Sequence, residues 1–413
     1  MTSEPPRAFV WVWLPGADEP LPAGRLDRVG PSLTFTYGRR YLAREDAVAL
    51  FLPELPLTRG PIMPLVGEAA GVIADAAPDS WGQRVILNHL VGRDALDTNE
   101  LGLLTYLLHS GSQRIGALDF QDSANEYVPR GAGGASLAEL ADAAQRVEAG
   151  IPLSPALDRA LLHGSSLGGA RPKALLSDHG RSLIAKFSSN IDHFPVVKGE
   201  FVAMRLAHLT GLNVAHVALS SALGRDVLLV ERFDRPAGGG RRMMVSALTI
   251  LGLDEIAAPY ASYADLAQTV RARFTEPSAT LRELFARITF NILVSNNDDH
   301  GRNHAAFWDG AMLTLTPAYD ICPQPRAGGE TAQAMAIGPD GGKLSRLASC
   351  VEHASTYLLT SREARETIDR QVDAIRGHWT EVCDEAGLSE VDRAIFWRRQ
   401  FLNPYAFEGY PQD

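Results

Sequence analysis

The sequence has few cysteines and no long hydrophobic run. Its 413 residues include only Cys322, Cys350 and Cys383, which lie far apart and form no C-x-x-C pair. This spacing excludes a disulfide framework and a cysteine-based zinc site, and it fits a reducing compartment. No apolar stretch reaches the roughly 18 residues of a membrane span, and the N-terminus has no basic segment followed by a long apolar core. We expect a soluble, cytoplasmic protein without membrane contact.

Positive charge is also in deficit. The chain has 39 Lys and Arg against 49 Asp and Glu, so its formal net charge is −10. This argues against a protein that coats nucleic acid over its whole surface, although a local basic patch stays open. Hydrophobic residues make up 46% of the chain and charged residues 21%, which is enough apolar material for large cores. The length predicts two or three domains.

The first 120 or so residues predict a mixed α/β segment. The runs AFVWVWL and SLTFTYG are typical of strands, whereas DSWGQRVILNHLV and NELGLLTYLLHSG are typical of helices. Residues 121–136 are polar and glycine-rich, and they are the best linker in the chain. Ser136 and Glu139 then form a capping box, which predicts a helix over residues 137–148.

The middle of the chain predicts a β-rich segment followed by a helical one. The stretch LLHGSSLGGARPKALLSDHGRSLIAKFSS predicts a glycine loop and two strands joined by a turn at SDHG. A helix over KGEFVAMRLAHLTGLN should end at Gly211, and RDVLLVERFDR predicts another strand. Beyond Arg241 the pattern is mostly helical. The fold class we predict is therefore α+β.

A concentrated polar stretch, SNNDDHGRNHAAFWDG, occupies residues 295–310 and follows an apolar run over residues 281–294 that predicts a helix. Polar groups at the end of a buried helix are costly unless they are paired, bind a metal or do chemistry. Within the stretch, Asp309-Gly310 predicts a two-residue hairpin turn between apolar runs. The hairpin would bring three oxygen-bearing side chains together: Asp298, Asn303 and Asp320.

Two carboxylates and one amide oxygen suit Mg²⁺, with phosphates supplying the remaining ligands. Asp298 and Asn303 have the D-x-x-x-x-N spacing of a kinase catalytic loop, and Asp320 follows the hairpin as the second metal-binding Asp would. We expect His300 to brace this loop beside the nucleotide by hydrogen bonding. Two alternatives stay open: a polar helix end with solvated acids, and a zinc pair from His300 and His304 at i, i+4.

A kinase also needs a phosphate-binding loop and a lysine before the catalytic loop. The run GSSLGGARPK supplies Gly164, Gly168 and Gly169, which allow backbone N–H groups to approach phosphates, with Lys173 close behind. Lys186 lies in a predicted strand, where a lysine is either an edge residue or a phosphate ligand. The run matches neither G-x-G-x-x-G nor a Walker A motif, so a plain glycine-rich turn is the alternative.

The run VERFDR occupies the position of a hinge between two kinase lobes. Backbone groups at Glu231, Phe233 and Asp234 would read adenine there, and the alternative is a simple cluster of acids at a strand end. Glu200 opens a predicted helix, and it either pairs with Lys186 or is a solvated acid of the first turn. The order of glycine loop, lysine, helix, hinge, D-x-x-x-x-N and Asp is that of a kinase.

These motifs resemble the HipA family, serine/threonine kinases that are the toxins of bacterial toxin–antitoxin pairs. The resemblance rests on NNDDHGRNHAAFW, LTPAYDI, GSSLGGARPKALL, LIAKFSS, VERFDR, DSWGQRVI and RIGALDF. It implies a kinase-like, two-lobed fold that uses ATP and Mg²⁺. A HipA-type N-terminal subdomain would cover residues 1–125, a nucleotide-binding lobe residues 126–235 and a helical catalytic lobe residues 236–413.

The resemblance also implies roles for single residues. Asp298 would be the catalytic base, Asn303 and Asp320 the Mg²⁺ ligands, and Lys186 the residue that holds the ATP phosphates. Such kinases autophosphorylate a glycine-loop serine, which here is Ser166 or its neighbour Ser165, and both would lie beside the nucleotide. Two residues depart from the family pattern: Asp299 stands where a small residue is common, and Arg302 where lysine is usual.

The family further implies partners. These are a small helix-turn-helix antitoxin of HipB type, operator DNA reached through that antitoxin, and a protein substrate. Known family substrates include aminoacyl-tRNA synthetases, and nothing in this sequence identifies the target. Two other functions stay open: a small-molecule or lipid kinase, because the same phosphoryl-transfer parts serve other acceptors, and a catalytically idle corepressor that only binds an antitoxin.

Overall fold

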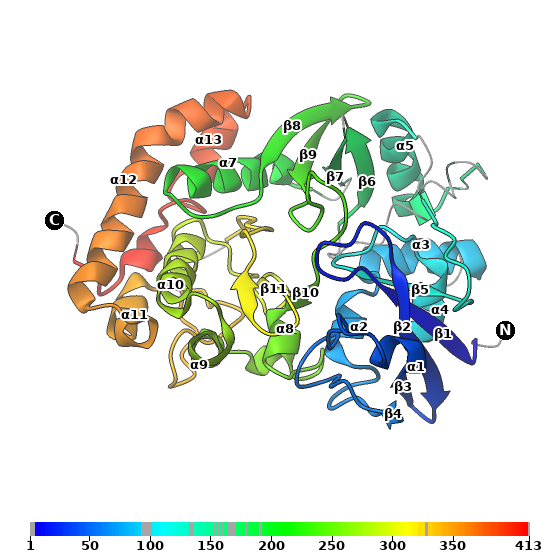
Figure 1. The fold of residues 1–413 in the computed structure, drawn as a ribbon. Helices are drawn as coiled ribbons and strands as arrows, with labels where there is room; N and C mark the ends of the chain where they lie inside the picture. The colour runs from blue at the N-terminus through cyan, green and yellow to red at the C-terminus, as the bar shows by residue number, and fades with distance from the viewer. Residues whose placement is uncertain are drawn as a thin grey trace. The chain divides into compact units, whose positions relative to one another are not determined.

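The computed structural model describes residues 5–91, 101–131, 135–151, 153–154, 157, 161–162, 171–178, 180–189, 192–326 and 329–411. The chain forms two compact units, which are both α+β (Figure 1). The first unit comprises Met1–Ile191, Ser220–Val245 and Phe307–Ala311, and the second comprises Asp192–Leu219, Ser246–Ala306 and Met312–Asp413.

The first unit begins with an antiparallel five-stranded sheet in the order β4-β3-β2-β1-β5 (Figure 1). The central strand β2 was not predicted, because Pro22 and Gly24 make its sequence a poor match to a strand. Gly24 is required there, since a Cβ atom would lie 2.3 Å from the carbonyl oxygen of Thr36. The strands are β1 (Arg7–Val12), β2 (Leu21–Val29), β3 (Ser32–Tyr37), β4 (Pro61–Ile62) and β5 (Leu118–Gln121).

A second sheet of the first unit has the order β6-β7-β9-β8. The predicted strands on either side of SDHG are confirmed as β6 and β7, and the predicted capping box of Ser136 and Glu139 is confirmed at the start of α5. The strands of this sheet are β6 (Lys173–Asp178), β7 (Arg181–Phe187), β8 (Val217–Ala222) and β9 (Arg225–Glu231). The unit's helices are α1 (Arg39–Leu42), α2 (Gly71–Asp75), α3 (Ser80–Leu90), α4 (Leu103–His109) and α5 (Leu137–Glu148).

One hydrophobic core joins α3, α5 and the second sheet, and it includes the buried side chains of Trp81, Leu140 and Phe187. The indole of Trp81 also donates a hydrogen bond of 3.1 Å to the carbonyl oxygen of Lys173. The motif DSWGQRVI therefore holds the first residue of β6. The predicted segments 1–125 and 126–235 share this core, and the boundary between them stays a prediction.

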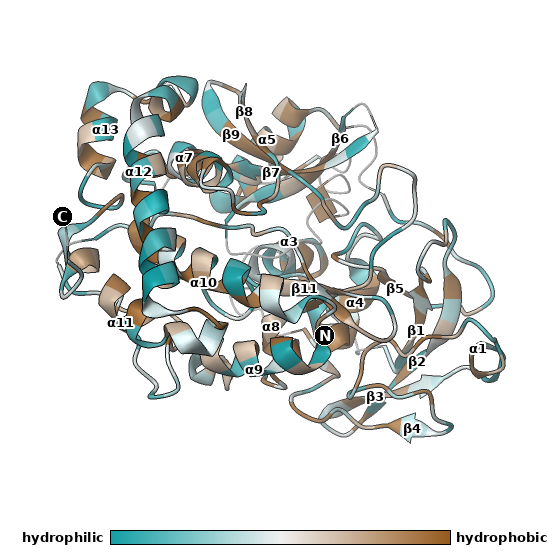
Figure 2. Cartoon of the chain, turned by 60° about the vertical axis from the view of Figure 1, so that its left-hand side comes forward, coloured by the Kyte–Doolittle hydropathy of each residue, from teal (hydrophilic) through white to brown (hydrophobic). Residues whose placement is uncertain are grey.

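In the second unit, α10 packs against α9 and α12, and α7 packs against α12. Figure 2 shows α12 with hydrophilic residues along much of its length, and its buried side includes Ile368, Val372 and Ile375. Among the described helices, none is both long and apolar enough to cross a membrane. The longer helices are α7 (Val196–Leu209), α9 (Tyr263–Arg273), α10 (Pro277–Leu293) and α12 (Ser361–Glu385), and the shorter ones are α8 (Ala247–Ile250), η2 (Ala258–Tyr260), α11 (Leu347–Glu352), η3 (Ala354–Tyr357), α13 (Glu390–Phe396) and η4 (Pro404–Phe407).

The predicted hairpin is present as β11 (Ala305–Trp308) and β12 (Leu313–Leu315), which continue a sheet begun by β10 (Met244–Ser246). The prediction of a two-residue turn is wrong, because four residues separate the two strands in the sequence. Asp309 accepts a hydrogen bond from the backbone N–H of Ala311, which closes an Asx-type turn and lengthens the connection. The predicted register is confirmed where the N–H of Thr316 donates to the carbonyl of Ala305 at 3.0 Å.

A fully buried ion pair joins Asp119 of β5 to Arg114 in the first unit. The Arg114 guanidinium donates to Asp119 at 2.9 Å, and Arg130 donates to the same carboxylate at 3.0 Å. Burial alone would raise the pKa of Asp119, but these two arginines lower the pKa to about 2. The carboxylate therefore stabilises the folded state at every pH above its ordinary pKa, and this contribution is lost as the pH falls towards 2.

We expect Asp119→Asn to lower the free energy of unfolding at neutral pH, and the deficit to shrink by about 2 kcal/mol between pH 5 and pH 2. Denaturant titrations of the wild type and the variant across this range measure the difference. Asp122→Asn, at an exposed carboxylate three residues along the chain, controls for the general effect of acid. A deficit that is independent of pH would show that the charge of Asp119 is not what the arginines stabilise.

Candidate active site

The polar stretch begins where α10 ends in a Schellman motif. The N–H of Ser295 donates to the carbonyl of Ile292, and the N–H of Asn296 donates to the carbonyl of Asn291. Ser295 takes the left-handed position that glycine usually occupies, with φ of 54°. Its hydroxyl donates to the carbonyl of Gln400 at 2.6 Å, which holds this turn. The predicted helix over residues 281–294 is thus confirmed, and the chain turns sharply into the loop that follows.

This loop brings Asp298 and Asn303 together. The side-chain amide of Asn303 donates to the carbonyl oxygen of Asp298 at 3.1 Å, and its backbone N–H donates to the carbonyl of His300 at 2.8 Å. Asp320 is the third member, because its charge acts on the Asp298 carboxylate and its carbonyl lies 3.5 Å from the Asn296 amide. The three residues that the hairpin argument predicted to cluster therefore do so.

Asp298 is exposed, which leaves its carboxylate open to a reactant. Partial desolvation raises the pKa of Asp298 above its ordinary value, and the negative charges of Asp320 and Asp299 raise it further, although His300 opposes them. A raised pKa means a higher proton affinity, which suits a group that takes a proton from a hydroxyl.

The donor set fits a hard divalent cation such as Mg²⁺. Because the amide nitrogen of Asn303 bonds to Asp298, the amide oxygen is the atom that remains for a cation. Asp320 adds a carboxylate from a left-handed backbone position, with φ of 59°. Among the residues that the structure describes, no three His, Cys, Asp or Glu side chains form a metal site by themselves. A cation here would rely on the amide and on ligands from a substrate, as Mg²⁺ does with phosphates.

The next residue of the loop, Asp299, has a buried carboxylate. The sequence did not predict its structural role. The carboxylate accepts hydrogen bonds from the hydroxyl of Tyr263, from the amide of Asn291 at 2.7 Å and from the ring of His304, whose Nε2 lies 2.9 Å away. These donors come from α9, from α10 and from the residue before β11. One carboxylate thus ties the loop to two helices and a strand.

The charge of Asp299 is stabilised by its partners. Burial alone would raise the pKa of Asp299, but His304 and the hydrogen bonds from His304 and Tyr263 lower it overall. Burial and the adjacent carboxylate raise the pKa of Tyr263 well above its usual value. The adjacent acids therefore have different environments, because Asp298 faces solvent and Asp299 is enclosed by donors. The departure from the family pattern at Asp299 marks a structural anchor.

The two histidines of the loop have separate partners. His300 accepts a hydrogen bond of 3.3 Å from the backbone N–H of Arg302, so it braces the loop as predicted, and His304 binds Asp299. The loop between them is not helical. The zinc-pair alternative is therefore wrong.

The predicted lysines lie in the first unit. Lys173 and Lys186 are directly opposite each other in the β6–β7 ladder, where two like charges are unfavourable. The ammonium of Lys173 is buried and bonds to Asp79 at 2.9 Å, and Asp79 also caps α3 by accepting from the N–H of Gly82. Lys186 is half-buried on β7. A phosphate contact by Lys173 would have to share its ammonium with Asp79, and the phosphate roles of both lysines stay predictions.

The predicted hinge contains a buried carboxylate. Asp234 bonds to Arg232 and Arg235 and accepts a hydrogen bond of 2.8 Å from the backbone N–H of Gly116. Burial alone would raise its pKa, but the two arginines hold the pKa of Asp234 well below its ordinary range. The Asp234 carboxylate is therefore bonded within the fold. A nucleotide contact at Asp234 would have to come from its backbone, and the adenine contacts predicted for Glu231 and Phe233 are backbone contacts too.

Other predictions have mixed outcomes. Glu200 is 3% exposed, so its reading as a solvated acid of a first turn is wrong. The glycine-loop residues lie outside the described residues, and their roles stay predictions: Gly164, Ser165, Ser166, Gly168 and Gly169.

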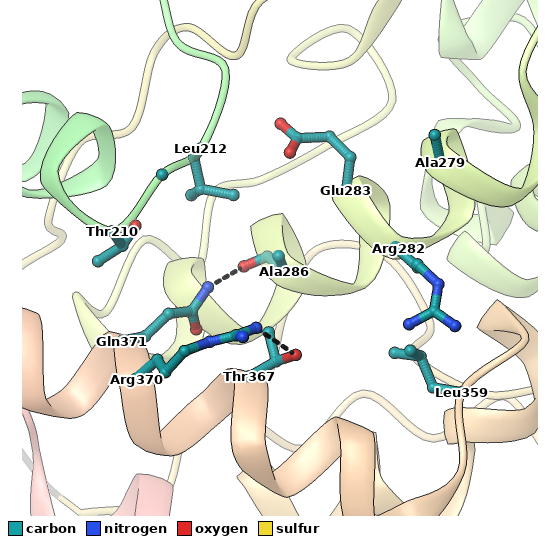
Figure 3. A pocket seen from close by; sticks show the side chains of 11 residues that line it. Thr210, Leu212, Ala279, Arg282, Glu283, Ala286, Leu359, Thr367, Arg370 and Gln371 are labelled. Carbon is teal, nitrogen blue, oxygen red and sulfur yellow. Dashed lines mark hydrogen bonds between the residues drawn. The ribbon is translucent and has the colours of Figure 1, made fainter.

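A pocket of about 290 Å³ opens in the second unit between α10, α12 and the turn after α7 (Figure 3). Arg282 and Glu283 of α10 and Arg370 and Gln371 of α12 line it. None of its lining residues belongs to the predicted site, so the candidate active site rests on the loop after α10.

Asp299→Asn should keep the size of the side chain but remove its charge. All three donors bond to one carboxylate oxygen, and an uncharged amide oxygen would be a weaker acceptor there. We expect the free energy of unfolding to fall by about 3 kcal/mol, because three buried donors lose a charged acceptor. Denaturant titration measures this loss, and Asp373→Asn on the exposed side of α12 should change stability by less than about 0.5 kcal/mol. If Asp299→Asn is as stable as the wild type, the carboxylate is not the anchor of the loop.

Comparison with known proteins places this site in a family. A model of the HipA-like C-terminal domain matches residues 165–379, and a model of the HipA N-terminal domain matches residues 12–121. The first match alone covers more than half of the chain and includes the whole loop after α10.

Individual relatives agree with this assignment. The chain is 28% identical over 187 residues to the serine/threonine-protein kinase toxin HipA of Shewanella oneidensis, which is 38% of this chain and 42% of that protein. It is 33% identical over 141 residues to the putative kinase Y4mE of Sinorhizobium fredii, which is 32% of this chain and 33% of that protein. The matched segments thus span less than half the length of either relative.

The fold is similar to a solved structure over nearly its full length. The HipA chain in the complex of Shewanella oneidensis HipA, HipB and operator DNA matches with a TM-score of 0.68 and 20% identity. The match covers 96% of this chain and 99% of that one, so the α+β, kinase-like architecture predicted from the sequence is confirmed. The chain belongs to the HipA family.

Proposed function

We propose that this protein is an ATP- and Mg²⁺-dependent serine/threonine protein kinase. The observation that carries the proposal is the convergence of Asp298, Asn303 and Asp320 at the end of α10, in the order and spacing of a kinase catalytic loop. Membership of the HipA family supports it, as do the names of the curated relatives, a kinase toxin and a putative kinase.

In the proposed reaction, the hydroxyl of a serine or threonine attacks the γ-phosphorus of ATP. The new oxygen–phosphorus bond forms as the bond to the β–γ bridging oxygen breaks, and ADP leaves. Asp298 orients the hydroxyl and takes its proton, a role that its exposure and raised pKa favour. Asp299 acts only through the shape of the loop, because its carboxylate is enclosed by three donors.

Asn303 and Asp320 would hold Mg²⁺, which supplies positive charge to the phosphates when it is bound. Lys186 and the glycine loop would bind the phosphates, and the backbone from Glu231 to Asp234 would read adenine. Lys173 would also contact a phosphate only by sharing its ammonium with Asp79.

Self-modification of the glycine loop is part of the proposal. A phosphate on Ser166, or on Ser165, would carry a charge of about −1.5 to −2 at neutral pH. That charge would compete with the phosphates of ATP for loop amides and for Lys186. Phosphorylation of the loop would therefore switch the kinase off.

The proposed biological setting is a toxin–antitoxin pair. The solved relative with a similar fold is a HipA bound to HipB and operator DNA, which supports a helix-turn-helix antitoxin of HipB type as the partner of this chain. Operator DNA would then be reached through the antitoxin, in keeping with the net charge of −10. The proposed target is a protein, and aminoacyl-tRNA synthetases are the first class to test.

Incubation with labelled ATP and Mg²⁺ should transfer label to the protein itself or to a bacterial lysate protein. Asp298→Asn should reduce this transfer by at least roughly 100-fold while nucleotide binding survives, because the lost group acts on the acceptor's proton. Asp373→Asn is the matched control, and peptide mapping should place self-label on Ser166 or Ser165.

Equal transfer by wild type and Asp298→Asn would show that Asp298 is not the base, and no transfer by either would favour an idle corepressor. Label in lipid or small molecules alone would favour another kinase class.

A further inference from the structure

Unpaired polar atoms are concentrated around the candidate active site. Among the described residues, every buried side-chain nitrogen or oxygen without a hydrogen-bond partner lies in the second unit. They belong to the catalytic loop, to the segment 321–346 that follows Asp320, and to the residue whose carbonyl holds Ser295. The residues are Asn296, His304, Arg326, Gln333, Ser345, Arg346 and Gln400.

Gln333 is the extreme case, because neither its amide oxygen nor its amide nitrogen has a partner among the described residues. Its side chain is 2% exposed. A buried, unpaired amide lowers stability, and an apolar side chain of similar size would not carry this penalty. Such a group calls for an explanation, and use in another state of the protein is one that fits its place beside a functional site.

A short antiparallel ladder fixes the position of Gln333. The N–H of Gln333 donates to the carbonyl of Lys343 at 2.7 Å, and the N–H of Ser345 donates to the carbonyl of Thr331 at 2.9 Å. Alternate residues of such a ladder share one face, so Thr331, Gln333 and Ser345 lie on the same side. Gln333 and Ser345, both with unpaired side-chain atoms, are thus neighbours on one surface of the segment.

That surface adjoins the residue before the proposed base. The amide of Asn297 donates to the hydroxyl of Thr331 at 2.8 Å, and the N–H of Ala334 donates to the carbonyl of Asn297 at 3.1 Å. Two hydrogen bonds therefore dock the ladder onto Asn297, one residue from Asp298. In phosphoryl transfer the base is the group that meets the acceptor hydroxyl, so this is the acceptor side of the site.

We propose that Gln333 is an acceptor-binding residue, whose amide pairs with the main chain of the protein segment that carries the phosphorylated serine or threonine. A primary amide offers both a donor and an acceptor, which matches the C=O and N–H of an extended peptide. Because the amide is enclosed in this structure, acceptor binding must shift the 331–345 ladder to reach it. The inference rests on the proposed kinase function, in which the acceptor is a protein, and it names one residue that would bind this acceptor.

The test replaces Gln333 with methionine, which has a similar size and no hydrogen-bonding amide. Gln333→Met should raise the thermal midpoint by roughly 2–4 °C, because it removes unpaired buried atoms. The same variant should raise KM for the acceptor by roughly tenfold, which corresponds to about 1.4 kcal/mol of binding, with KM for MgATP unchanged. The acceptor used is a mixture of random peptides with one central serine.

Gln371 provides a matched control, because it is also 2% exposed but has a fully paired amide. Its amide nitrogen donates to the carbonyl of Ala286 at 2.7 Å, and its amide oxygen accepts from the hydroxyl of Thr289 at 2.9 Å (Figure 3 shows the first bond). Gln371→Met should lower the thermal midpoint and leave the acceptor KM unchanged. Opposite shifts of the two midpoints would identify the Gln333 amide as unpaired in the free protein.

An unchanged acceptor KM in Gln333→Met would overturn the inference, whatever happens to the thermal midpoint. A higher midpoint would then mean that the amide only destabilises the fold, and a lower midpoint would mean that the amide is paired with buried water. Ser345→Ala, which removes the neighbouring unpaired hydroxyl, should also raise the acceptor KM, and it keeps the idea testable if Gln333→Met does not fold. A wild type that binds MgATP but labels no peptide or protein would instead contradict the proposed kinase function, and the inference would fall with it.

Discussion

The geometry of the candidate active site depends on the buried carboxylate of Asp299. Its hydrogen bonds reach Tyr263 of α9, Asn291 of α10 and His304 just before β11, so a single charge fixes the loop that carries Asp298. A buried charge is tolerated only when it is paired and hydrogen-bonded, and this one is. The loop can therefore expose Asp298 to a reactant while its backbone stays held from below. The Schellman motif at Ser295 adds a second constraint, since it sets the direction in which the chain leaves α10.

In the first unit, the motifs RIGALDF and VERFDR depend on each other. Arg232 donates to the carbonyl of Arg114 at 2.6 Å, and Arg235 donates to the carbonyl of Gly116 at 2.9 Å. The N–H of Gly116 in turn bonds to the buried Asp234. Buried guanidinium groups and a carboxylate thus satisfy the backbone of a segment more than a hundred residues away. This explains why a buried acid, Asp234, follows β9.

Local signals explain what the sequence predicted well. The capping box at Ser136 and Glu139 and the two strands around SDHG depend on neighbouring residues, so pattern and turn chemistry suffice. The clustering of Asp298, Asn303 and Asp320 was predictable because one hairpin controls it. Strand β2 was missed because pairing on both sides overrides its Pro and Gly, and the hairpin turn was too short because Asp309 makes an Asx turn. Two partners of the buried acids are distant in the sequence, Tyr263 for Asp299 and Gly116 for Asp234, and no local pattern indicates them.

The central claim is that Asp320 acts through a metal ion bound to nucleotide phosphates. Its most direct test is the shift of the thermal midpoint on adding ATP, with Mg²⁺ or with EDTA, for the wild type and Asp320→Ala. A ligand at 100 times its Kd adds about 2.7 kcal/mol to apparent stability, so the shift is measurable. We expect the variant to lose most of the shift in Mg²⁺ and to match the wild type in EDTA. An equal loss in both conditions would contradict the claim and would make Asp320 a structural residue under the hairpin.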